Sequence, residues 1–239
     1  MADLLETAIE AHGGLDRWEK AKKLSVRYTA TGITDLKGWK GAFLDVTVVI
    51  DPHRPLAEIS PFIEPDQTAL FEPSRTAIIR RSTGDIITER FEPRQAFEGH
   101  SLNTPWDPQH LAYFAGYALW TYLTTPFLFN LPGFEATEVE PWIEDGEEWR
   151  RLRVVFPPEV ASHSREQVFY FDKSGLLKRH DYSADVLGGT SSANYALAPK
   201  SFGGLIIPTK RRVYAKDSNN RPLLDRVAVA INIHDVVTA

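Results

Sequence analysis

The chain has 239 residues, of which 43% are hydrophobic and 25% charged, with a formal net charge of −5 and no cysteine. These values are ordinary for a globular protein and exclude a disordered chain, a collagen and a polytopic membrane protein. The acidic balance argues against nucleic-acid binding, and the absence of cysteine excludes disulfides, thiol catalysis and cysteine-ligated metals.

The first 22 residues predict two short helices. Apolar residues from Leu4 to Ile9 follow the helical period, and Gly13-Gly14 ends that helix. A second helix over 16–22 has an acidic start and a basic end, as the helix macrodipole favours. No basic start followed by an apolar run is visible, so we expect a cytoplasmic protein. A periplasmic protein that begins after a removed signal would show the same start.

From Leu24 onward, apolar and polar residues alternate, which predicts β-strands. Turn residues separate short runs as far as Val236, and many neighbouring runs form hairpins, which amounts to about eleven to thirteen strands. No internal repeat, linker or low-complexity tract interrupts them. We therefore expect one domain over 1–239, mainly β with helices (α+β), built on a large curved antiparallel sheet.

One segment between the strands, 107–125, predicts an internal helix. Asp107 is a suitable N-cap, Pro108 a suitable first helical residue, and Pro126 ends the helix. The stretch from Leu111 to Phe134 carries no charge, which raises the question of a membrane span. Its prolines and polar residues favour a buried helix instead. A helix that is apolar all round must be covered all round, so we expect it to lie in the hollow of the sheet.

Gly116 lies in the middle of this helix. A glycine there costs about 1 kcal/mol relative to alanine and often marks the close approach of another group. That group is either the backbone of a strand or a bound ligand, and the sequence leaves both open.

Four segments carry a resemblance to a group of uncharacterised bacterial proteins: AHGGLDRW (11–18), WDPQHLAYFAGYALW (106–120), SHSREQVFYFDKSGLLKRHDYSADVLGG (162–189) and IIPTKRRVY (206–214). The order of helix, many-stranded antiparallel sheet and apolar internal helix also resembles the half-barrel of bacterial lipoprotein carriers, the LolA/LolB-like fold. In that family a curved sheet and inserted helices enclose an apolar cavity for acyl chains. The resemblance covers most of the chain and implies this fold, but it assigns no activity.

The predicted strand 176–184 carries polar groups on its more apolar face. His180 and Tyr182 share that face and should point into the hollow, whereas Arg179 and Asp181 should point outward. His180 and Asp181 therefore cannot form a catalytic dyad. The functional interpretation is a donor or acid–base pair in a cavity. The alternative is a buried polar pair that the backbone and water satisfy.

His163, just before a predicted strand, either reaches the rim of the same hollow or is solvated. On the predicted strand 205–215, Arg211 and Arg212 point to opposite faces, so one of them brings a cation inward. That cation either binds a carboxylate or phosphate headgroup at a cavity mouth or pairs with an acid on a neighbouring strand.

Buried polar groups are costly, and apolar residues would be cheaper in a closed core. We therefore expect His180 and Tyr182 to border a cavity on the order of a few hundred Å³. It should lie between the internal helix and the strands 176–184 and 205–215. Its apolar wall should be formed by Tyr113, Tyr117 and Trp120, with Arg211 or Arg212 near its mouth.

The sequence contains no HxH or HExxH spacing and no nucleotide-binding motif, so we expect no metal and no cofactor. The first functional hypothesis is binding of a small apolar or amphipathic molecule, such as a lipid, terpenoid or polyketide. The alternative is a cofactor-independent hydrolase, isomerase or cyclase that acts on a hydrophobic substrate through His180 and Tyr182. A third possibility is a scaffold with a filled core. The expected partner is a small hydrophobic molecule.

Overall fold

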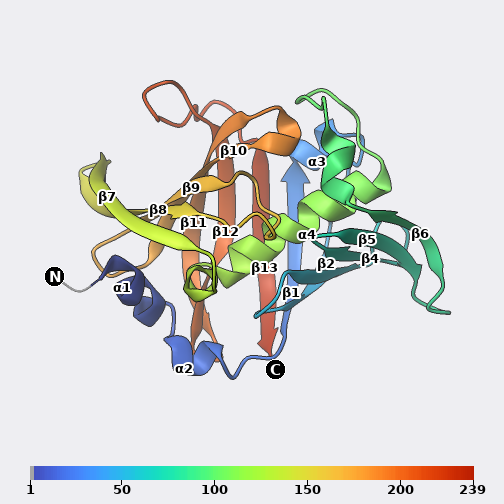
Figure 1. Ribbon diagram of the computed structural model, residues 1–239, viewed down its shortest axis with the longest axis horizontal. Coiled ribbons are helices and arrows are strands. Elements are labelled where there is room, and N and C mark those ends of the chain that lie inside the picture. Colours follow the sequence, from blue (N-terminus) through green and yellow to red (C-terminus); the bar gives the residue numbers. More distant parts are fainter. Residues whose placement is uncertain (1–2) are drawn as a thin grey trace.

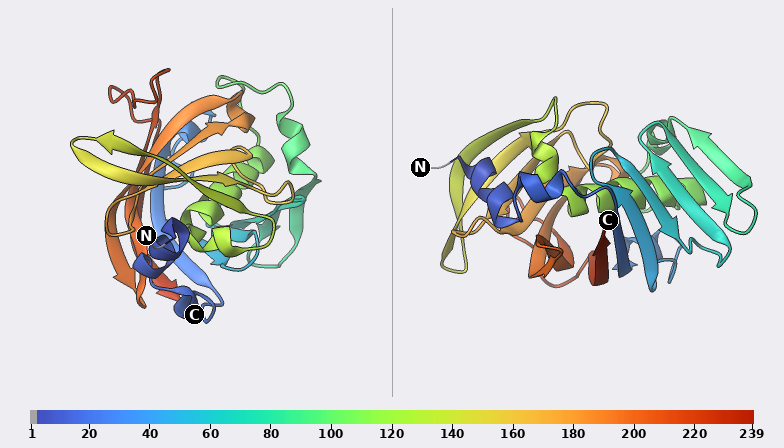
Figure 2. Two further views of the ribbon diagram at one scale, coloured as in Figure 1. Left: turned by 60° about the vertical axis from the view of Figure 1, so that its left-hand side comes forward. Right: turned by 90° about the horizontal axis from the view of Figure 1, so that it is seen from below.

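The structure, a computed structural model, describes residues 3–239. Thirteen strands of this part form one antiparallel sheet in the order β6-β5-β4-β3-β2-β1-β13-β12-β11-β10-β9-β8-β7. Each half is a simple meander, and β1 (Leu24–Gly32) joins the halves by pairing with β13 (Val229–Thr238). The sheet is open, with β6 and β7 at its edges, and it curves around a central helix (Figures 1 and 2). The predicted curved antiparallel half-barrel is confirmed.

The remaining strands of the first half are β2 (Val46–Asp51), β3 (Leu56–Ser60), β4 (Gln67–Glu72), β5 (Arg75–Arg80) and β6 (Ile86–Phe91). Those of the second half are β7 (Glu135–Glu144), β8 (Glu147–Val155), β9 (Glu166–Phe171), β10 (Leu177–Ala184), β11 (Thr190–Phe202) and β12 (Leu205–Ala215). The long strand β11 gave no clear alternation in the sequence, because small and polar residues dominate it.

The helices are α1 (Leu4–Ala11), α2 (Leu15–Trp18), α3 (Ile33–Leu36) and α4 (Pro108–Thr124), with 3-10 turns η1 (Pro93–Phe97), η2 (Phe127–Asn130) and η3 (Asp185–Leu187). The side chain of Asp107 caps α4 by accepting from the His110 backbone N–H at 2.9 Å, as its position predicted. The helix expected over 16–22 is shorter, because the backbone N–H groups of Lys22 and Lys23 bond to the carbonyl of Ala239.

Helix α4 connects the two open edges of the sheet. The chain leaves β6, passes through the hollow as α4 and resumes as β7 at the opposite edge (Figure 1). Its 17 residues span about 25 Å. All residues from Gln109 to Thr124 are buried, so this helix has no solvent face. Within residues 3–239, no helix is both long and apolar enough to cross a membrane.

Two residues show how closely α4 packs on the first half of the sheet. A Cβ atom at Gly116 would lie 2.3 Å from the Cβ and Cγ atoms of Phe71 on β4. A close approach at Gly116 is confirmed, but the approaching group is the side chain of Phe71 rather than the strand backbone or ligand that the sequence suggested. Trp120 is fully buried, and its indole N–H donates to the carbonyl of Asp51 at 2.9 Å.

We expect Gly116→Ala to destabilise the protein by about 1–3 kcal/mol, although alanine is the better helix former by about 1 kcal/mol. The reason is that the buried Phe71 ring has to move to admit the methyl group. Urea unfolding measures the change. In the Phe71→Leu background, where a smaller side chain replaces the ring, Gly116→Ala should destabilise the protein less. A net gain of stability in the single variant Gly116→Ala would contradict this packing.

The convex face of β10 differs from the expectation that Arg179 and Asp181 point into solvent. Both side chains lie on that face, but they are only 0% and 4% exposed. Arg179 donates to both carboxylate oxygens of Asp181 at 2.6 and 2.8 Å, to Glu144 at 2.7 Å and to the carbonyl of Asn220 at 2.7 Å. Lys216 completes this convex ion network through Asp181 at 2.8 Å. The end of β7 and the loop after β12 thus cover charges that the strand pattern assigned to the surface.

Candidate functional site

Beneath α4, the hollow holds a group of buried polar side chains, which we call the inner polar cluster. Its members are Tyr117, Tyr122, His163, Gln167, His180, Tyr182, Asn194 and Arg211. They come from α4, from the loop between β8 and β9, and from β9 to β12. The sequence predicted that His180 and Tyr182 point inward, and both lie on this concave face. The roles of Tyr122, Gln167 and Asn194 were missed, because a strand pattern does not show which polar residues meet in space.

His163 lies at the centre of the inner polar cluster. Its Nδ1 and Nε2 atoms are 3.2 Å and 2.8 Å from the hydroxyls of Tyr117 and Tyr122. The Tyr122 hydroxyl lies 3.0 Å from that of Tyr182, on which the His163 ring also stacks at 3.8 Å. These groups form a continuous hydrogen-bonded chain across the hollow. His180 lies beside this chain and bonds to Gln167, with 2.5 Å between Nε2 and Oε1, and Gln167 in turn donates to the carbonyl of Ser164 at 2.7 Å.

His163 is therefore neither solvated nor at the rim of the hollow. The loop that carries it turns inward, because its neighbours bond to the loop backbone. The Ser162 hydroxyl donates to the carbonyl of Ser164 at 2.9 Å, and the Ser164 hydroxyl donates to that of Glu166 at 2.9 Å.

Burial keeps the rings of the inner polar cluster neutral. Burial, together with the positive charges of Arg94 and Arg211, lowers the pKa of His163 to about 3. Burial likewise holds the pKa of His180 well below its usual value. It raises the pKa of Tyr122 to about 12 and that of Tyr182 well above 10. At neutral pH these side chains are uncharged hydrogen-bond donors and acceptors.

Arg211 points from β12 into the hollow and is 3% exposed. Its Nη2 atom donates to the carbonyl of Tyr122 at 2.9 Å, and its guanidinium lies 4.5 Å from the centre of the Tyr122 ring. That carbonyl lacks an intrahelical partner, because the residue four positions on is Pro126, which has no N–H. Arg211 thus satisfies the end of α4. Burial lowers its pKa to about 10, so it stays charged at neutral pH.

The structure does not bring Trp120 and Arg212 to the inner polar cluster. Trp120 packs toward the end of β2, on another side of α4. Arg212 lies on the convex face, where it donates to the carbonyls of Arg211 and Ile231 and to the side chain of Asn232. Of the two arginines, only Arg211 faces the hollow, and it lies deep inside rather than at a mouth.

A small apolar cavity of about 50 Å³ adjoins the inner polar cluster. Ala115 and Ala118 of α4 face Tyr28 on β1 and Ile231 on β13 across it, and the hydroxyl-bearing residues Tyr122 and Tyr182 border it as well. The cavity is smaller than expected and lies beside β1 and β13, because α4 and its aromatic side chains fill most of the hollow.

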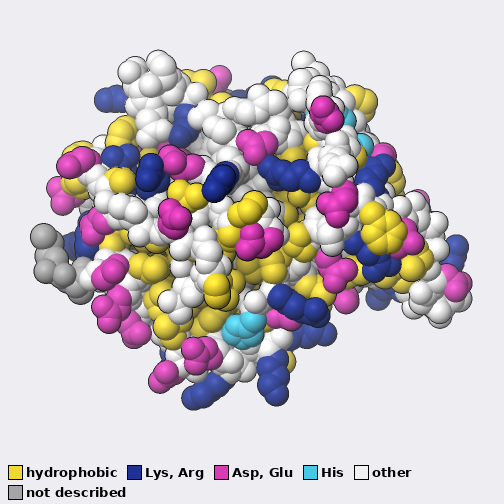
Figure 3. All heavy atoms as spheres, viewed as in Figure 1, with side chains coloured by type: hydrophobic (Ala, Val, Ile, Leu, Met, Phe, Trp, Pro, Cys, Tyr) yellow, Lys and Arg dark blue, Asp and Glu magenta, His cyan; other side chains and the backbone are white. Residues whose placement is uncertain are grey.

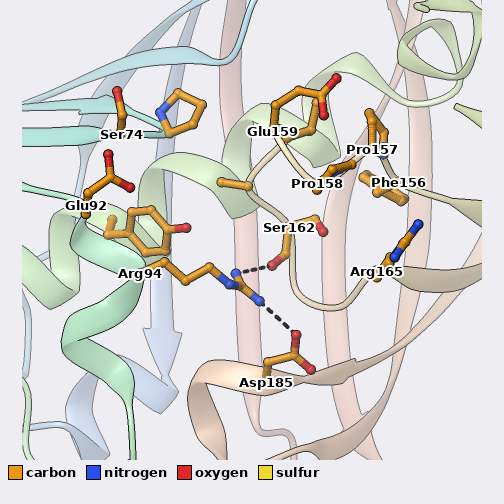
Figure 4. A pocket seen from close by; sticks show the side chains of 14 residues that line it. Ser74, Glu92, Arg94, Phe156, Pro157, Pro158, Glu159, Ser162, Arg165 and Asp185 are labelled. Carbon is orange, nitrogen blue, oxygen red and sulfur yellow. Dashed lines mark hydrogen bonds and ion pairs between the residues drawn. The ribbon is translucent and has the colours of Figure 1, made fainter. Parts of the chain in front are cut away.

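A larger groove of about 560 Å³ opens at the rim (Figure 4). Arg94 crosses it, donating to the carbonyl of Ser162 at 2.7 Å and to Asp185 at 2.8 Å. Tyr113 lines the groove, and its ring centre is 5.3 Å from that of Tyr117, one helical turn deeper. The groove and the inner polar cluster are thus separated by the loop that carries Ser162 and His163. No pattern in the sequence singled out Arg94.

Apolar side chains are visible through the middle of the face shown in Figure 3, which is the view of Figure 1. Within residues 3–239, no three His, Asp or Glu side chains gather in a way that could hold a metal ion. The side chains of the hollow offer tyrosine, histidine, amide and guanidinium groups against an apolar lining.

No protein-family model matches the chain, and no curated protein matches its sequence. Several solved structures resemble it, and three of them are described in turn. A LolA superfamily protein from Nitrosomonas europaea superimposes with a TM-score of 0.52 at 11% identity, over 98% of this chain and 90% of that one. A DUF1329 family protein from Desulfovibrio piger gives 0.52 at 10% identity, over 98% and 91%. An outer membrane lipoprotein-sorting protein domain from Vibrio parahaemolyticus gives 0.55 at 11% identity, over 98% and 91%. This likeness shows the fold, so the LolA-like half-barrel predicted from the sequence is confirmed.

Proposed function

We propose that this LolA-like half-barrel binds a small apolar or amphipathic molecule, such as a lipid, in the hollow beneath α4. The observation that carries the proposal is the apolar cavity next to buried polar groups that the fold leaves unpaired. The hydroxyl of Tyr28 and Nη1 of Arg211 have no hydrogen-bond partner in the described structure. An unpaired buried polar group costs about 1–3 kcal/mol, so a closed core would favour apolar residues there. One similar structure is named a lipoprotein-sorting domain, which agrees with a lipid ligand.

Binding a lipid requires the hollow to widen. Ligand pockets usually enclose roughly 300–1,000 Å³, and the groove has about 560 Å³ whereas the inner cavity has about 50 Å³. A lipid that binds against Ala115 and Ala118 therefore has to displace side chains that fill the hollow.

An enzyme that uses His180 and Tyr182 receives less support. A general acid or base works best when its pKa lies near the working pH. Burial moves the histidine pKa values of the inner polar cluster down and the tyrosine pKa values up, away from neutrality. Neutral donors and acceptors in fixed positions suit recognition of the polar end of a ligand.

Ala118→Val tests the site by placing two methyl groups into the cavity. We expect the affinity for a fluorescent fatty-acid probe to fall about tenfold or more, while the free energy of unfolding changes by less than about 1 kcal/mol. Fluorescence titration and urea unfolding measure the two quantities. Ala112→Val is the matched control, since Ala112 is buried on the same helix but does not line the cavity. We expect it to keep the probe affinity; equal binding by Ala118→Val and the unaltered protein would contradict the proposal.

Native mass spectrometry of protein purified from its own host provides a probe-free test. A co-purified lipid that is present in the unaltered protein and reduced in Ala118→Val would support a ligand in this cavity. A lipid retained equally in both proteins would place the ligand elsewhere.

A further inference from the structure

Arg211 is a buried cation that the fold leaves without a counter-charge. One side of its guanidinium is used by the carbonyl of Tyr122, whereas Nη1 has no partner. Its other close contact is the face of the Tyr122 ring, and it forms no ion pair within residues 3–239. By contrast, the equally buried Arg179 pairs with Asp181 and Glu144. Burying an unpaired charge is costly, so an arginine kept in this state indicates a partner from outside the chain.

Asn194 offers a second donor on the same concave face. It pairs in register with Val213, and Arg211 pairs with Ala196, so Asn194 and Arg211 are diagonal neighbours on adjacent strands. Asn194 is fully buried, and its amide lies near the Tyr122 hydroxyl, whose pKa it helps to lower, but neither amide atom makes a hydrogen bond of good geometry. A guanidinium and an amide N–H side by side are the donors that suit a carboxylate.

The surroundings indicate how much negative charge the hollow can take. His163 and His180 are neutral, and the charge of Arg211 itself opposes their protonation. Arg211 therefore supplies one positive charge to this part of the hollow, which matches a monoanion. The chain as a whole carries a net charge of −5. Long-range attraction consequently does not favour anions, and any preference for an acid has to come from a local contact.

We propose that the ligand of the hollow is a long-chain carboxylic acid whose carboxylate binds Arg211 Nη1, with Asn194 as a second donor. This inference rests on the proposed function and adds the chemistry of the polar end. The apolar chain lies along the cavity wall formed by Ala115, Ala118 and Ile231. Tyr122 lies between the carboxylate site and the apolar cavity, because it contacts Arg211 and also lines the cavity.

Three probes with the same sixteen-carbon chain distinguish the contribution of the charge to binding from that of the apolar chain. They are hexadecanoic acid, hexadecanol and methyl hexadecanoate. Their affinities are measured at pH 8 by displacement of a neutral fluorescent probe. The unaltered protein should bind the acid about tenfold or more tightly than the alcohol or the ester. In Arg211→Gln this preference should fall to about one, because the amide still donates to the Tyr122 carbonyl but carries no charge. Arg211→Lys, which keeps the charge, should retain part of the preference.

Asn194→Leu is the second variant, and it tests the carboxylate inference even if Arg211→Gln does not fold. The Asn194 amide only approaches the Tyr122 hydroxyl and makes no hydrogen bond of good geometry, so the leucine variant should fold with a melting temperature close to that of the unaltered protein. We expect its preference for the acid to fall about threefold or more, through loss of one donor.

The outcomes distinguish this inference from the proposed function. If the unaltered protein binds acid, alcohol and ester equally, the carboxylate inference is wrong and the lipid-binding proposal stands. An acid preference that persists unchanged in both Arg211→Gln and Asn194→Leu would also overturn the carboxylate inference, since the carboxylate would then bind at other residues. If none of the three probes binds, the proposed function fails and this inference fails with it.

Discussion

Replacing Arg179 by methionine should destabilise the protein by about 3–5 kcal/mol, the usual result of breaking a buried ion network from one side. Arg179 holds both oxygens of Asp181 and one of Glu144, and its side chain is fully buried. Methionine fills much of the volume but leaves both carboxylates short of a partner. Lys216 still reaches Asp181, so part of the charge stays compensated.

Urea unfolding of Arg179→Met measures this loss, and Arg165→Met is the matched control. Arg165 has the same side chain but is exposed and makes no ion pair within residues 3–239, so its replacement should change stability by less than about 0.5 kcal/mol. The triple variant Arg179→Met/Asp181→Asn/Glu144→Gln, which also removes the stranded charges, should recover part of the loss. A loss below about 1 kcal/mol in Arg179→Met would show that the network is open to solvent.

Acid should unfold this protein through its buried histidines. Unfolded histidines take up protons below about pH 6.5, whereas burial lowers the pKa of folded His163 to about 3. The unfolded state therefore binds more protons over this interval, and stability falls as pH decreases from about 6.5 toward 3. Above pH 6.5 the contribution is fully present. The shift corresponds to roughly 3–5 kcal/mol for His163, and His180 adds to it in the same direction.

The free energy of unfolding between pH 8 and pH 4 tests this account. His163→Gln should lose about 3 kcal/mol less over that range than the unaltered protein, because it removes one titrating group. At pH 8 the same variant should be less stable, since the hydrogen bonds with Tyr117 and Tyr122 are disturbed. His234→Gln is the control, because His234 is exposed, and its profile should follow that of the unaltered protein. Parallel profiles for all three proteins would contradict a neutral buried His163.

The fold followed from local patterns that need no tertiary information. Alternation marks strands, Asp107-Pro108 marks the start of α4, and an all-apolar helix has to be enclosed. Sequential hairpins then require an antiparallel sheet with the helix in its hollow. The inward direction of His180 and Tyr182 also followed, because the period of a strand is two.

The candidate site required the tertiary structure, because its residues meet through elements far apart in the chain. His163 reaches Tyr117 and Tyr122 only because its loop folds under α4, and a loop sequence does not show that direction. The volume of the cavity depends on how side chains of α4 and β1 fill the hollow, which periodicity does not give.

The alternation of a strand shows which of its residues share a face. Which face is concave on β12, and which segments cover each face, follows only from the packing of the whole chain. Arg179 and Asp181 lie on the convex face as the strand period requires, yet Glu144 from β7 and Asn220 from a distant loop bury them. Arg211 lies on the concave face, and only the packed structure shows that no carboxylate within residues 3–239 pairs with it there. The physical reason is that strand geometry is set between neighbouring residues, whereas burial and charge pairing depend on contacts between segments far apart in the chain.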